Sequence, residues 1–361
     1  MTNLLFMQKA LDLAARGKGR TSPNPMVGAV IVKGNKIIAE GYHRKAGTAH
    51  AEVVALKKAG SGAQGATLYV NLEPCCHREK RTPPCTRAII TSGIKRVVVA
   101  MIDPNPQVSG RGLKELRKAG IRTETGVMKD EAKKLNESFI KHVTKKEPFV
   151  ILKIAQSLDG KIATARGDSK WITGPKARTL VHQLRNDVDA LLVGIGTVKA
   201  DDPSLDCRIR GGRNPYRVIV DSHLHIPASS KILRHNDSKT IVATTKMAGK
   251  NKLKSLVKKG NKILVIKEKE GRVDLKSLMR ELGKLDITSV MIEGGSSISA
   301  SSLSGKIVDK VMFFIAPKII GGVDAIPSVG GISPAVLKDT LKLKNTQTTT
   351  YGDDILIEGY L

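Results

Sequence analysis

The chain has 361 residues, which is long for one domain and indicates two. Its 61 Lys and Arg residues outnumber 33 Asp and Glu residues, and the formal net charge of +28 favours phosphate-bearing partners, either nucleic acid or a small phosphorylated substrate. Aromatic residues make up only 3% of the chain, which argues against the stacking platforms that bind single-stranded nucleic acid.

The cysteine content and the N-terminal sequence predict a cytoplasmic protein. Four cysteines without a secretory signal pattern are typical of a reducing compartment, where clustered cysteines bind metals more often than they form disulfides. The first twenty residues have the pattern of an amphipathic helix, and no apolar run approaches the length of a membrane span. We therefore expect neither a membrane nor nucleic acid among the partners.

The first part of the chain predicts alternating helices and strands. A helix is expected at 4–16, followed by strands at 27–32 and 36–42 that are joined by a hairpin turn at Gly34-Asn35. Thr48 is expected to cap a helix that carries His50 and Glu52. Later elements are strands at 66–72, 96–101 and 121–126, and helices from Cys85, at 112–120 and at 129–143. This alternation predicts a largely parallel sheet between layers of helices.

A short polar segment that ends in proline, Lys145-Lys146-Glu147-Pro148, predicts a domain boundary. We assign residues 1–145 to a first domain and residues 149–361 to a second α/β domain. The strands expected in the second domain lie at 149–155, 188–193, 216–221, 240–244, 262–266, 288–292, 307–315 and 353–359.

One His, two Cys and a Glu in the first domain indicate a catalytic zinc site. His50, Cys75 and Cys85 supply three ligands of the kinds that Zn²⁺ prefers, and catalytic zinc sites leave the fourth position to water. Glu52 is placed to move a proton between that water and a substrate nitrogen. The pattern follows the signature of nucleobase deaminases, except that nine residues separate the two cysteines in place of two.

Two glycine-containing turns in the second domain indicate a phosphate-binding or cofactor-binding site. Gly194, Gly196 and Thr197 follow an apolar strand, and Glu293 precedes the second turn at 294–296. The full G-x-G-x-x-G fingerprint is absent, so each turn alone is weak evidence. Two such turns after apolar strands favour a site where helix N-termini meet phosphate.

The motifs of both halves, taken together and in order, resemble those of a known family. They are SPNPMVGAVIV, GYHRKAGTAHAEV, NLEPCCH and RTPPC in the first half, and LKIAQSLDGKIA, GDSKWITG, HQLRNDVDALLVGIGTV, DDPSL and IEGG in the second. The chain resembles the bifunctional riboflavin-biosynthesis deaminase-reductases over nearly its whole length. The resemblance implies a cytidine-deaminase-like α/β/α sandwich followed by a dihydrofolate-reductase-like α/β domain, with Zn²⁺ and NADPH as cofactors.

The same resemblance implies two consecutive reactions and a homodimer or homotetramer. The first is hydrolytic deamination of a diaminopyrimidinone ribosylamine 5′-phosphate. The second is the NADPH-dependent opening of the ribosyl group to a ribityl chain, which gives 5-amino-6-ribitylamino-uracil 5′-phosphate.

In the first domain the resemblance implies that three residues contact the substrate. Asn24 has an amide suited to the pyrimidine edge, His43 matches a residue near the substrate, and Arg81 matches a basic residue on the substrate phosphate. Each also has a simpler interpretation, as a turn residue, a structural histidine and a free loop arginine respectively.

In the second domain the resemblance implies two sets of contacts. The substrate set is Lys153, Ser169, Arg185, Leu205, Arg208 and Glu293. The cofactor set is Ala155, Trp171, Thr197, Asp201, Ser222, Gly294, Gly295 and Ser296. Asp201 and Glu293 could bind ribose hydroxyls or handle the proton that accompanies reduction, and core packing is the alternative for Trp171.

Three rival hypotheses remain open at this point. A zinc-dependent nucleic-acid (tRNA) deaminase with a C-terminal binding domain would fit the charge, and it requires stacking aromatics near the metal. A structural zinc protein requires a fourth protein ligand and has no use for Glu52. The third possibility is that one of the two domains has lost its activity.

Overall fold

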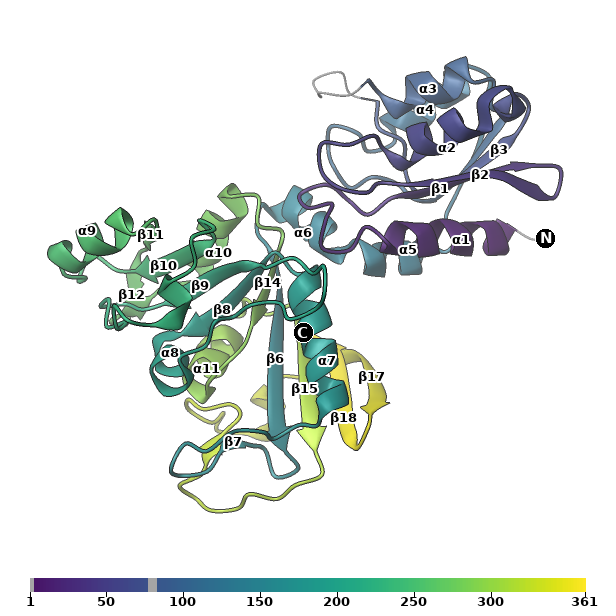
Figure 1. Ribbon diagram of the computed structural model, residues 1–361. Coiled ribbons are helices and arrows are strands. Elements are labelled where there is room, and N and C mark those ends of the chain that lie inside the picture. The colour runs from purple at the N-terminus through teal and green to yellow at the C-terminus, as the bar shows by residue number, and fades with distance from the viewer. Residues whose placement is uncertain (1–2, 77–82) are drawn as a thin grey trace. The chain divides into compact units, whose positions relative to one another are not determined.

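The computed structural model describes residues 3–76 and 83–361, and contacts within the chain divide it into two compact units, Met1–Lys146 and Glu147–Leu361 (Figure 1). Across these described residues no helix is long and apolar enough to cross a membrane.

The first unit is a five-stranded mixed sheet between helices. Its strand order is β2-β1-β3-β4-β5. The strands are β1 (Gly28–Lys33), β2 (Lys36–Tyr42), β3 (Thr67–Leu72), β4 (Arg96–Met101) and β5 (Arg122–Thr125). Only β3, β4 and β5 run parallel, whereas β1 is antiparallel to both β2 and β3. The expected hairpin turn at Gly34-Asn35 is confirmed, because β1 and β2 pair antiparallel across it. The sheet is less parallel than expected because β1 also pairs antiparallel with β3.

Helices cover both faces of this sheet. They are α1 (Asn3–Ala15), α2 (Ala51–Ala59), α3 (Cys85–Thr91), α4 (Arg111–Lys118), α5 (Lys129–Leu135) and α6 (Glu137–Lys145), with a short 3₁₀ turn at Gly60–Ala63. Helices α1 and α5 lie on one face, and α2, α3 and α4 lie on the other (Figure 1). Gly41 in β2 lets α2 approach closely, since a Cβ at this position would lie 2.4 Å from the carbonyl oxygen of Ala51.

The helix expected at 129–143 is two helices, α5 and α6, which meet at Asn136. The Asn136 side chain is buried and forms two hydrogen bonds with the backbone of Met26. It accepts from the Met26 N–H at 2.8 Å and donates to the Met26 carbonyl at 3.0 Å. Continuous helical periodicity predicted one helix, and this tertiary contact decides where the chain bends.

The second unit is built on a nine-stranded sheet of order β11-β10-β9-β8-β14-β6-β15-β18-β17. The strands are β6 (Phe149–Ser157), β8 (Ala190–Gly194), β9 (Tyr216–Val220), β10 (Thr240–Thr244), β11 (Lys262–Val265), β14 (Ser289–Ile292), β15 (Lys310–Ala316), β17 (Lys344–Tyr351) and β18 (Asp354–Tyr360). Neighbouring strands from β11 through β15 in this order are parallel. At the other end of the sheet, β18 pairs antiparallel with both β15 and β17. All eight expected strands occur here within three residues of their predicted ends, whereas β17 was not predicted.

Five helices pack on this sheet: α7 (Pro175–Asp187), α8 (Ile195–Asp201), α9 (Lys250–Lys258), α10 (Leu275–Lys284) and α11 (Ser296–Ser304). Shorter elements are the ribbons β7 (Lys161–Ala163) with β16 (Ile326–Pro327) and β12 (Glu268–Lys269) with β13 (Arg272–Val273), and the 3₁₀ turns Lys231–Leu233 and Leu337–Asp339. Successive residues of β8 pack alternately into two separate hydrophobic core clusters. Both faces of the sheet are therefore buried at β8. Helix α8 begins directly after the central strand β8, and α11 begins after three residues that follow β14.

Candidate active sites

Three potential metal ligands meet in the first unit. The ligand atoms of His50, Cys75 and Cys85 all lie within 4.8 Å of one another. Nδ1 of His50 is 3.2 Å from Sγ of Cys85 and 3.5 Å from Sγ of Cys75. His50 is the residue that precedes α2, Cys85 is the first residue of α3, and Cys75 follows the end of β3. The nine-residue spacing between the cysteines therefore spans a strand end and a helix start.

The protonation of the two cysteines shows that this donor set fits a cation. A hydrogen bond between Cys75 and Cys85 lowers the pKa of the Cys75 thiol to about 3. The same hydrogen bond, with burial, raises the pKa of the Cys85 thiol well above its ordinary value. Without a positive ion the pair keeps one proton, and a metal would make both sulfurs thiolates. One imidazole nitrogen and two sulfurs are ligands that suit Zn²⁺.

Glu52 lies beside the ligands but does not belong to the cluster. It is 3% exposed in the first turn of α2, and its Oε2 is a buried atom without a hydrogen-bond partner. Burial raises the pKa of the Glu52 carboxyl group. A buried carboxyl oxygen with no partner in the protein is available to a ligand.

The cap of α2 differs from the expected one. His50 occupies the N-cap position, and the Thr48 hydroxyl donates 2.7 Å to the Lys45 carbonyl in the preceding turn. The prediction that Thr48 caps the helix is therefore wrong. Placing the metal ligand at the helix start directs its ring toward Cys85.

Asn24 and His43 adjoin the metal ligands. The His43 and His50 rings meet edge to face with centroids 5.3 Å apart. Nδ1 of His43 donates to the Ala49 carbonyl at 3.2 Å, so Nε2 is the acceptor for the Asn24 amide nitrogen, also at 3.2 Å. This arrangement orients the Asn24 amide and gives it a fixed donor and acceptor pattern.

Buried asparagines that the sequence analysis did not single out position the segment after Asn24. Asn71 in β3 donates to the Met26 carbonyl at 2.9 Å and accepts from the Gly28 N–H at 2.9 Å. Asn136 binds the same Met26 backbone. An asparagine in an otherwise apolar strand is the only sequence signal of this role.

Glu73, also missed from sequence, holds the chain two residues before Cys75. Its carboxylate accepts the backbone N–H groups of Asp103, Gly110 and Leu113 at 3.1, 2.9 and 3.1 Å. These interactions fix the start of α4 against the end of β3. Arg81, the expected phosphate contact, lies outside the described residues.

In the second unit the expected cofactor residues gather where β8 and β14 end. These strands are parallel neighbours, and Gly194 and Gly295 are the caps of the helices that follow them. The Gly295 N–H donates to Oγ1 of Thr197 at 3.1 Å. Gly294 has φ of 125°, and a Cβ there would lie 2.5 Å from the same oxygen. Two helix N-termini thus meet through Thr197.

The buried Oγ of Ser296 in the first turn of α11 has no hydrogen-bond partner. Together with the N–H groups of the two helix starts, this donor fits the phosphate oxygens of a dinucleotide.

Three charged residues gather beside these turns. Arg185 in α7 forms a bidentate ion pair with Glu293. Its Nε donates to Oε1 at 3.0 Å, and its Nη2 donates to Oε2 at 2.7 Å. Burial acts to raise the pKa of Glu293, but the charges of Arg185 and Lys153 hold it down to about 2. Burial lowers the pKa of the Lys153 ammonium group, which faces this pair from β6. The group therefore holds an ionised Glu293 and a lysine that releases its proton readily.

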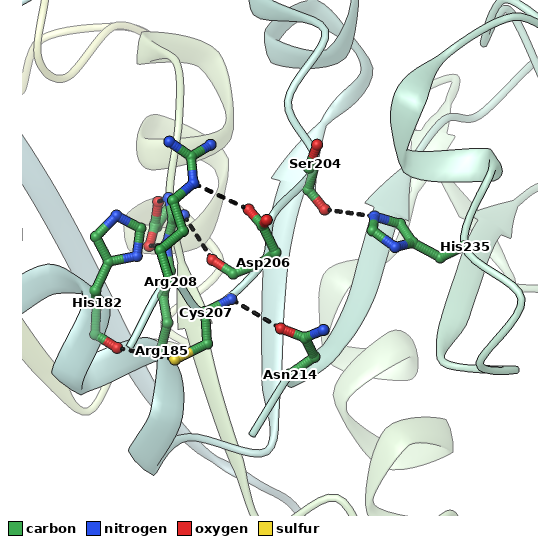
Figure 2. A network of polar contacts seen from close by, with 9 residues as sticks. His182, Arg185, Ser204, Asp206, Cys207, Arg208, Asn214 and His235 are labelled. Carbon is green, nitrogen blue, oxygen red and sulfur yellow. Dashed lines mark hydrogen bonds and ion pairs between the residues drawn. The ribbon is translucent and has the colours of Figure 1, made fainter. Parts of the chain in front are cut away.

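Figure 2 shows how the segment after α8 joins this group. Arg185 donates to the Asp206 carbonyl at 3.2 Å, and Arg208 forms an ion pair with the Asp206 carboxylate at 3.4 Å. The Cys207 N–H donates to Asn214 at 2.9 Å, and its thiol contacts the His182 carbonyl at 3.6 Å. Leu205, buried with φ of 50°, begins this turn. The role of Asp206 was missed from the sequence because it depends on the contact between the segment after α8 and Arg185 in α7.

The structure places the remaining expected contacts as follows. Ala155 lies on β6 two residues after Lys153, and Asp201 lies one helical turn after Thr197 on α8. Trp171 is 60% exposed, with the Arg178 guanidinium 4.8 Å from its ring centre, and partly exposed Ser169 lies in the same loop. The Ser222 hydroxyl accepts the Val273 N–H at 3.1 Å. No hydrogen bond described for Ser169, Trp171 or Ser222 joins them to the Arg185–Glu293 group.

Two protein-family models match the chain. The cytidine and deoxycytidylate deaminase zinc-binding region matches residues 1–101, which contain all three ligands and Glu52. The RibD C-terminal domain matches residues 148–357. Together these matches confirm the expected cytidine-deaminase-like first domain and reductase second domain with a dihydrofolate-reductase-like fold.

Curated relatives and solved structures match over the whole length. The riboflavin biosynthesis protein RibD of Aquifex aeolicus is 46% identical over 98% of this chain and 96% of its own. The corresponding protein of Actinobacillus pleuropneumoniae is 43% identical over 99% and 95%. Two solved structures each cover 99% of this chain and 98% of their own. RibD of Acinetobacter baumannii is 39% identical with a TM-score of 0.90. The diaminohydroxyphosphoribosylaminopyrimidine deaminase/5-amino-6-(5-phosphoribosylamino)uracil reductase of Thermotoga maritima is 41% identical with a TM-score of 0.88.

The three ligands with Glu52 in one domain, and the Arg185–Glu293 group beside paired helix N-termini in the other, are thus found in a chain that matches these proteins from end to end. The chain belongs to the RibD family of bifunctional riboflavin-biosynthesis enzymes, which join a zinc-binding deaminase domain to a reductase domain.

Proposed function

We propose that this chain deaminates 2,5-diamino-6-(ribosylamino)pyrimidinone 5′-phosphate and then reduces the product to 5-amino-6-(ribitylamino)uracil 5′-phosphate. Residues 1–145 would carry the first step with Zn²⁺, and residues 149–361 the second with NADPH. The observation that carries the proposal is the presence, in one chain, of a buried His–Cys–Cys–Glu cluster and a separate Arg–Glu–Lys group beside two helix N-termini.

In the first step His50, Cys75 and Cys85 would hold zinc, which when bound supplies a polarised water to the amino-bearing ring carbon. Glu52 would take a proton from the attacking water and return it to the departing ammonia. Its Oε2 is buried and has no hydrogen-bond partner, which supports this role. The oriented Asn24 amide, next to His43, would hold the pyrimidine edge, and Arg81 would hold the phosphate.

In the second step NADPH supplies the hydride. The reduction adds hydride to C1′ of the ribosyl group and a proton to the ring oxygen, which opens the sugar. We assign that proton to Lys153, because its burial lowers the pKa of the ammonium group. Glu293 would orient Lys153 and bind ribose hydroxyls while Arg185 holds Glu293 in place.

The remaining expected contacts divide between substrate and cofactor. Arg208, Ser169 and Leu205 would complete the substrate site. Thr197, Asp201, Ser296 and the glycines before it would hold the dinucleotide, with Ala155, Trp171 and Ser222 at its margins. We also propose a cytoplasmic homodimer or homotetramer with no nucleic-acid partner.

A coupled assay tests the proposal. The zinc-loaded protein is supplied with the diaminopyrimidinone ribosylamine phosphate, and ammonia release and NADPH oxidation are followed together. Both signals should appear, with NADPH oxidation dependent on prior deamination. Ammonia release without NADPH oxidation, even when pre-deaminated substrate is added, would refute the reductase assignment.

Thr197→Val is expected to raise the KM for NADPH about 5- to 10-fold, since it removes a hydroxyl that orients the Gly295 N–H without changing side-chain volume. Initial rates at varied NADPH check this, with Thr179→Val on the exposed side of α7 as the control. An unchanged KM would show that the contact has no part in cofactor binding.

A further inference from the structure

One histidine of the second unit has a chemical role open that the proposed function does not use. His182 lies in α7 three residues before Arg185, so the two side chains share one face of the helix. Nδ1 of His182 is a buried atom with no hydrogen-bond partner among the residues that the structure describes. A buried ring nitrogen of this kind is available to bind a ligand or to hold a proton.

Four charged side chains act on the His182 ring: Arg185 of α7, Asp206 and Arg208 of the segment after α8, and Glu293 after β14. Figure 2 shows the ring next to the Arg208 side chain, and the Cys207 thiol contacts the His182 carbonyl at 3.6 Å. Lys153 acts on the same group from β6 through its attraction to Glu293. The two positive and two negative neighbours of the ring cancel in charge. Burial, followed by the charges of the two arginines, lowers the pKa of the His182 imidazole, so the ring is neutral at pH 7 in the free protein.

Arg208 is the cation of this group that an anion can reach. Arg185 already binds both carboxylate oxygens of Glu293 and the carbonyl of Asp206. The Arg208 side chain is 62% exposed, and its described ion pair with Asp206 is a longer contact of 3.4 Å. Arg208 can therefore accept a phosphate without the loss of a buried interaction.

The substrate of the proposed reduction carries such a phosphate. A phosphate monoester has a second pKa of about 6, so near neutral pH it is close to a dianion. A phosphate bound to Arg208 would lie next to the His182 ring and would add almost two negative charges to a group whose charges otherwise cancel. A nearby negative charge favours the protonated form of an imidazole.

We propose that His182 is a further substrate-binding residue of the reductase site, which binds the 5′-phosphate together with Arg208 and takes up a proton from solvent as the phosphate binds. This inference rests on the proposed function, because it requires a phosphorylated substrate beside the Arg185–Glu293 group. The imidazolium donates a charge-assisted hydrogen bond to the phosphate in the complex, and the proton returns to solvent when the product leaves.

Isothermal titration calorimetry measures this proton uptake. Two ligands are compared at pH 7.0, 5-amino-6-(ribitylamino)uracil 5′-phosphate and its phosphate-free counterpart, each in two buffers that differ in ionisation enthalpy. A histidine of ordinary pKa is about one-quarter protonated at this pH. Wild type should therefore take up roughly 0.3 to 0.7 proton with the phosphorylated ligand and close to none with the other.

His182→Gln keeps a neutral hydrogen-bonding group that does not titrate. It should lose the proton uptake and raise the dissociation constant of the phosphorylated ligand about 10-fold, as for a lost hydrogen bond to a charged group. The dissociation constant of the phosphate-free ligand should change less than about twofold, because no charge-assisted bond is lost. His225→Gln, which replaces an exposed histidine in the loop after β9, is the matched control and should behave as wild type.

The rate of deamination and the KM for NADPH should stay at wild-type values in His182→Gln, which shows that both units are folded. His182→Asn is the second variant, since its amide can take the position of Nδ1, and it should also lose the proton uptake. Equal proton uptake in wild type and in both variants, or an equal loss of affinity for the two ligands, would overturn the role of His182.

The coupled assay separates this inference from the proposed function. Normal NADPH oxidation by a wild type that takes up no proton with the phosphorylated ligand would overturn the role of His182 alone. Absence of NADPH oxidation with pre-deaminated substrate would refute the reductase function itself, and the role of His182 with it.

Discussion

Glu52→Gln is expected to slow deamination by about 10²- to 10⁴-fold, the range typical of a lost general acid–base. Gln keeps the size of the buried side chain but cannot accept and return a proton. NADPH oxidation should therefore slow by the same factor with the diaminopyrimidinone substrate and remain normal with pre-deaminated substrate. Measuring both reactions on one preparation makes the reductase an internal control for folding.

Two further measurements make the Glu52 result specific. Zinc content should stay at wild-type level, since Glu52 is not among the three clustered ligands. Glu131→Gln, an exposed carboxyl in the first turn of α5, should leave both rates unchanged. Normal deamination by a zinc-loaded Glu52→Gln protein would remove Glu52 from the mechanism.

Glu293→Gln is expected to lower kcat/KM of the reductase step about 100-fold and to leave deamination intact. The carboxylate holds Arg185 by two hydrogen bonds and lies beside Lys153, and Gln cannot neutralise either cation. Removing one member of a buried ion pair leaves an uncompensated charge, with costs of about 3–5 kcal/mol. Stopped-flow or steady-state NADPH oxidation with pre-deaminated substrate measures the loss.

The same variant makes a prediction about stability and pH. The folded-state pKa of Glu293 is about 2, below its ordinary value of 4.5, so its carboxylate contributes about 3 kcal/mol to the free energy of unfolding. Because the folded pKa is depressed, this stability is fully present above pH 4.5 and is lost as the pH falls toward 2. The difference between wild type and Glu293→Gln in urea unfolding should therefore shrink over that window.

Glu281→Gln, which removes an exposed carboxylate on α10, controls for the loss of a surface charge. Its exposed pair with Lys284 should contribute less than about 1 kcal/mol. A constant difference between wild type and Glu293→Gln from pH 7 to pH 2 would mean that Glu293 is not held ionised by Arg185 and Lys153.

Local patterns predicted much of the secondary structure. Val and Ile runs bounded by turn residues marked β4 and the central strands of the second unit, because fully buried strands have continuous apolar sequences. The edge strand β17 was missed because its sequence, KNTQTTTY, buries almost no side chain and so carries no hydrophobic signal. The break at Asn136 was missed because it depends on hydrogen bonds to Met26, 110 residues earlier.

The sequence by itself determined the two-domain α/β class, the family and the types of residue available for chemistry, because residue types and motif order are properties of the chain. Only the tertiary structure brought His50 to Cys85 across 35 residues and Arg185 to Glu293 across 108. It also decided the ionisation of those groups, because a pKa depends on burial and on neighbouring charges that sequence separation does not reveal. For the same reason Glu73, Asn71 and Asp206 were recognised as supports of the sites only once their partners were in place.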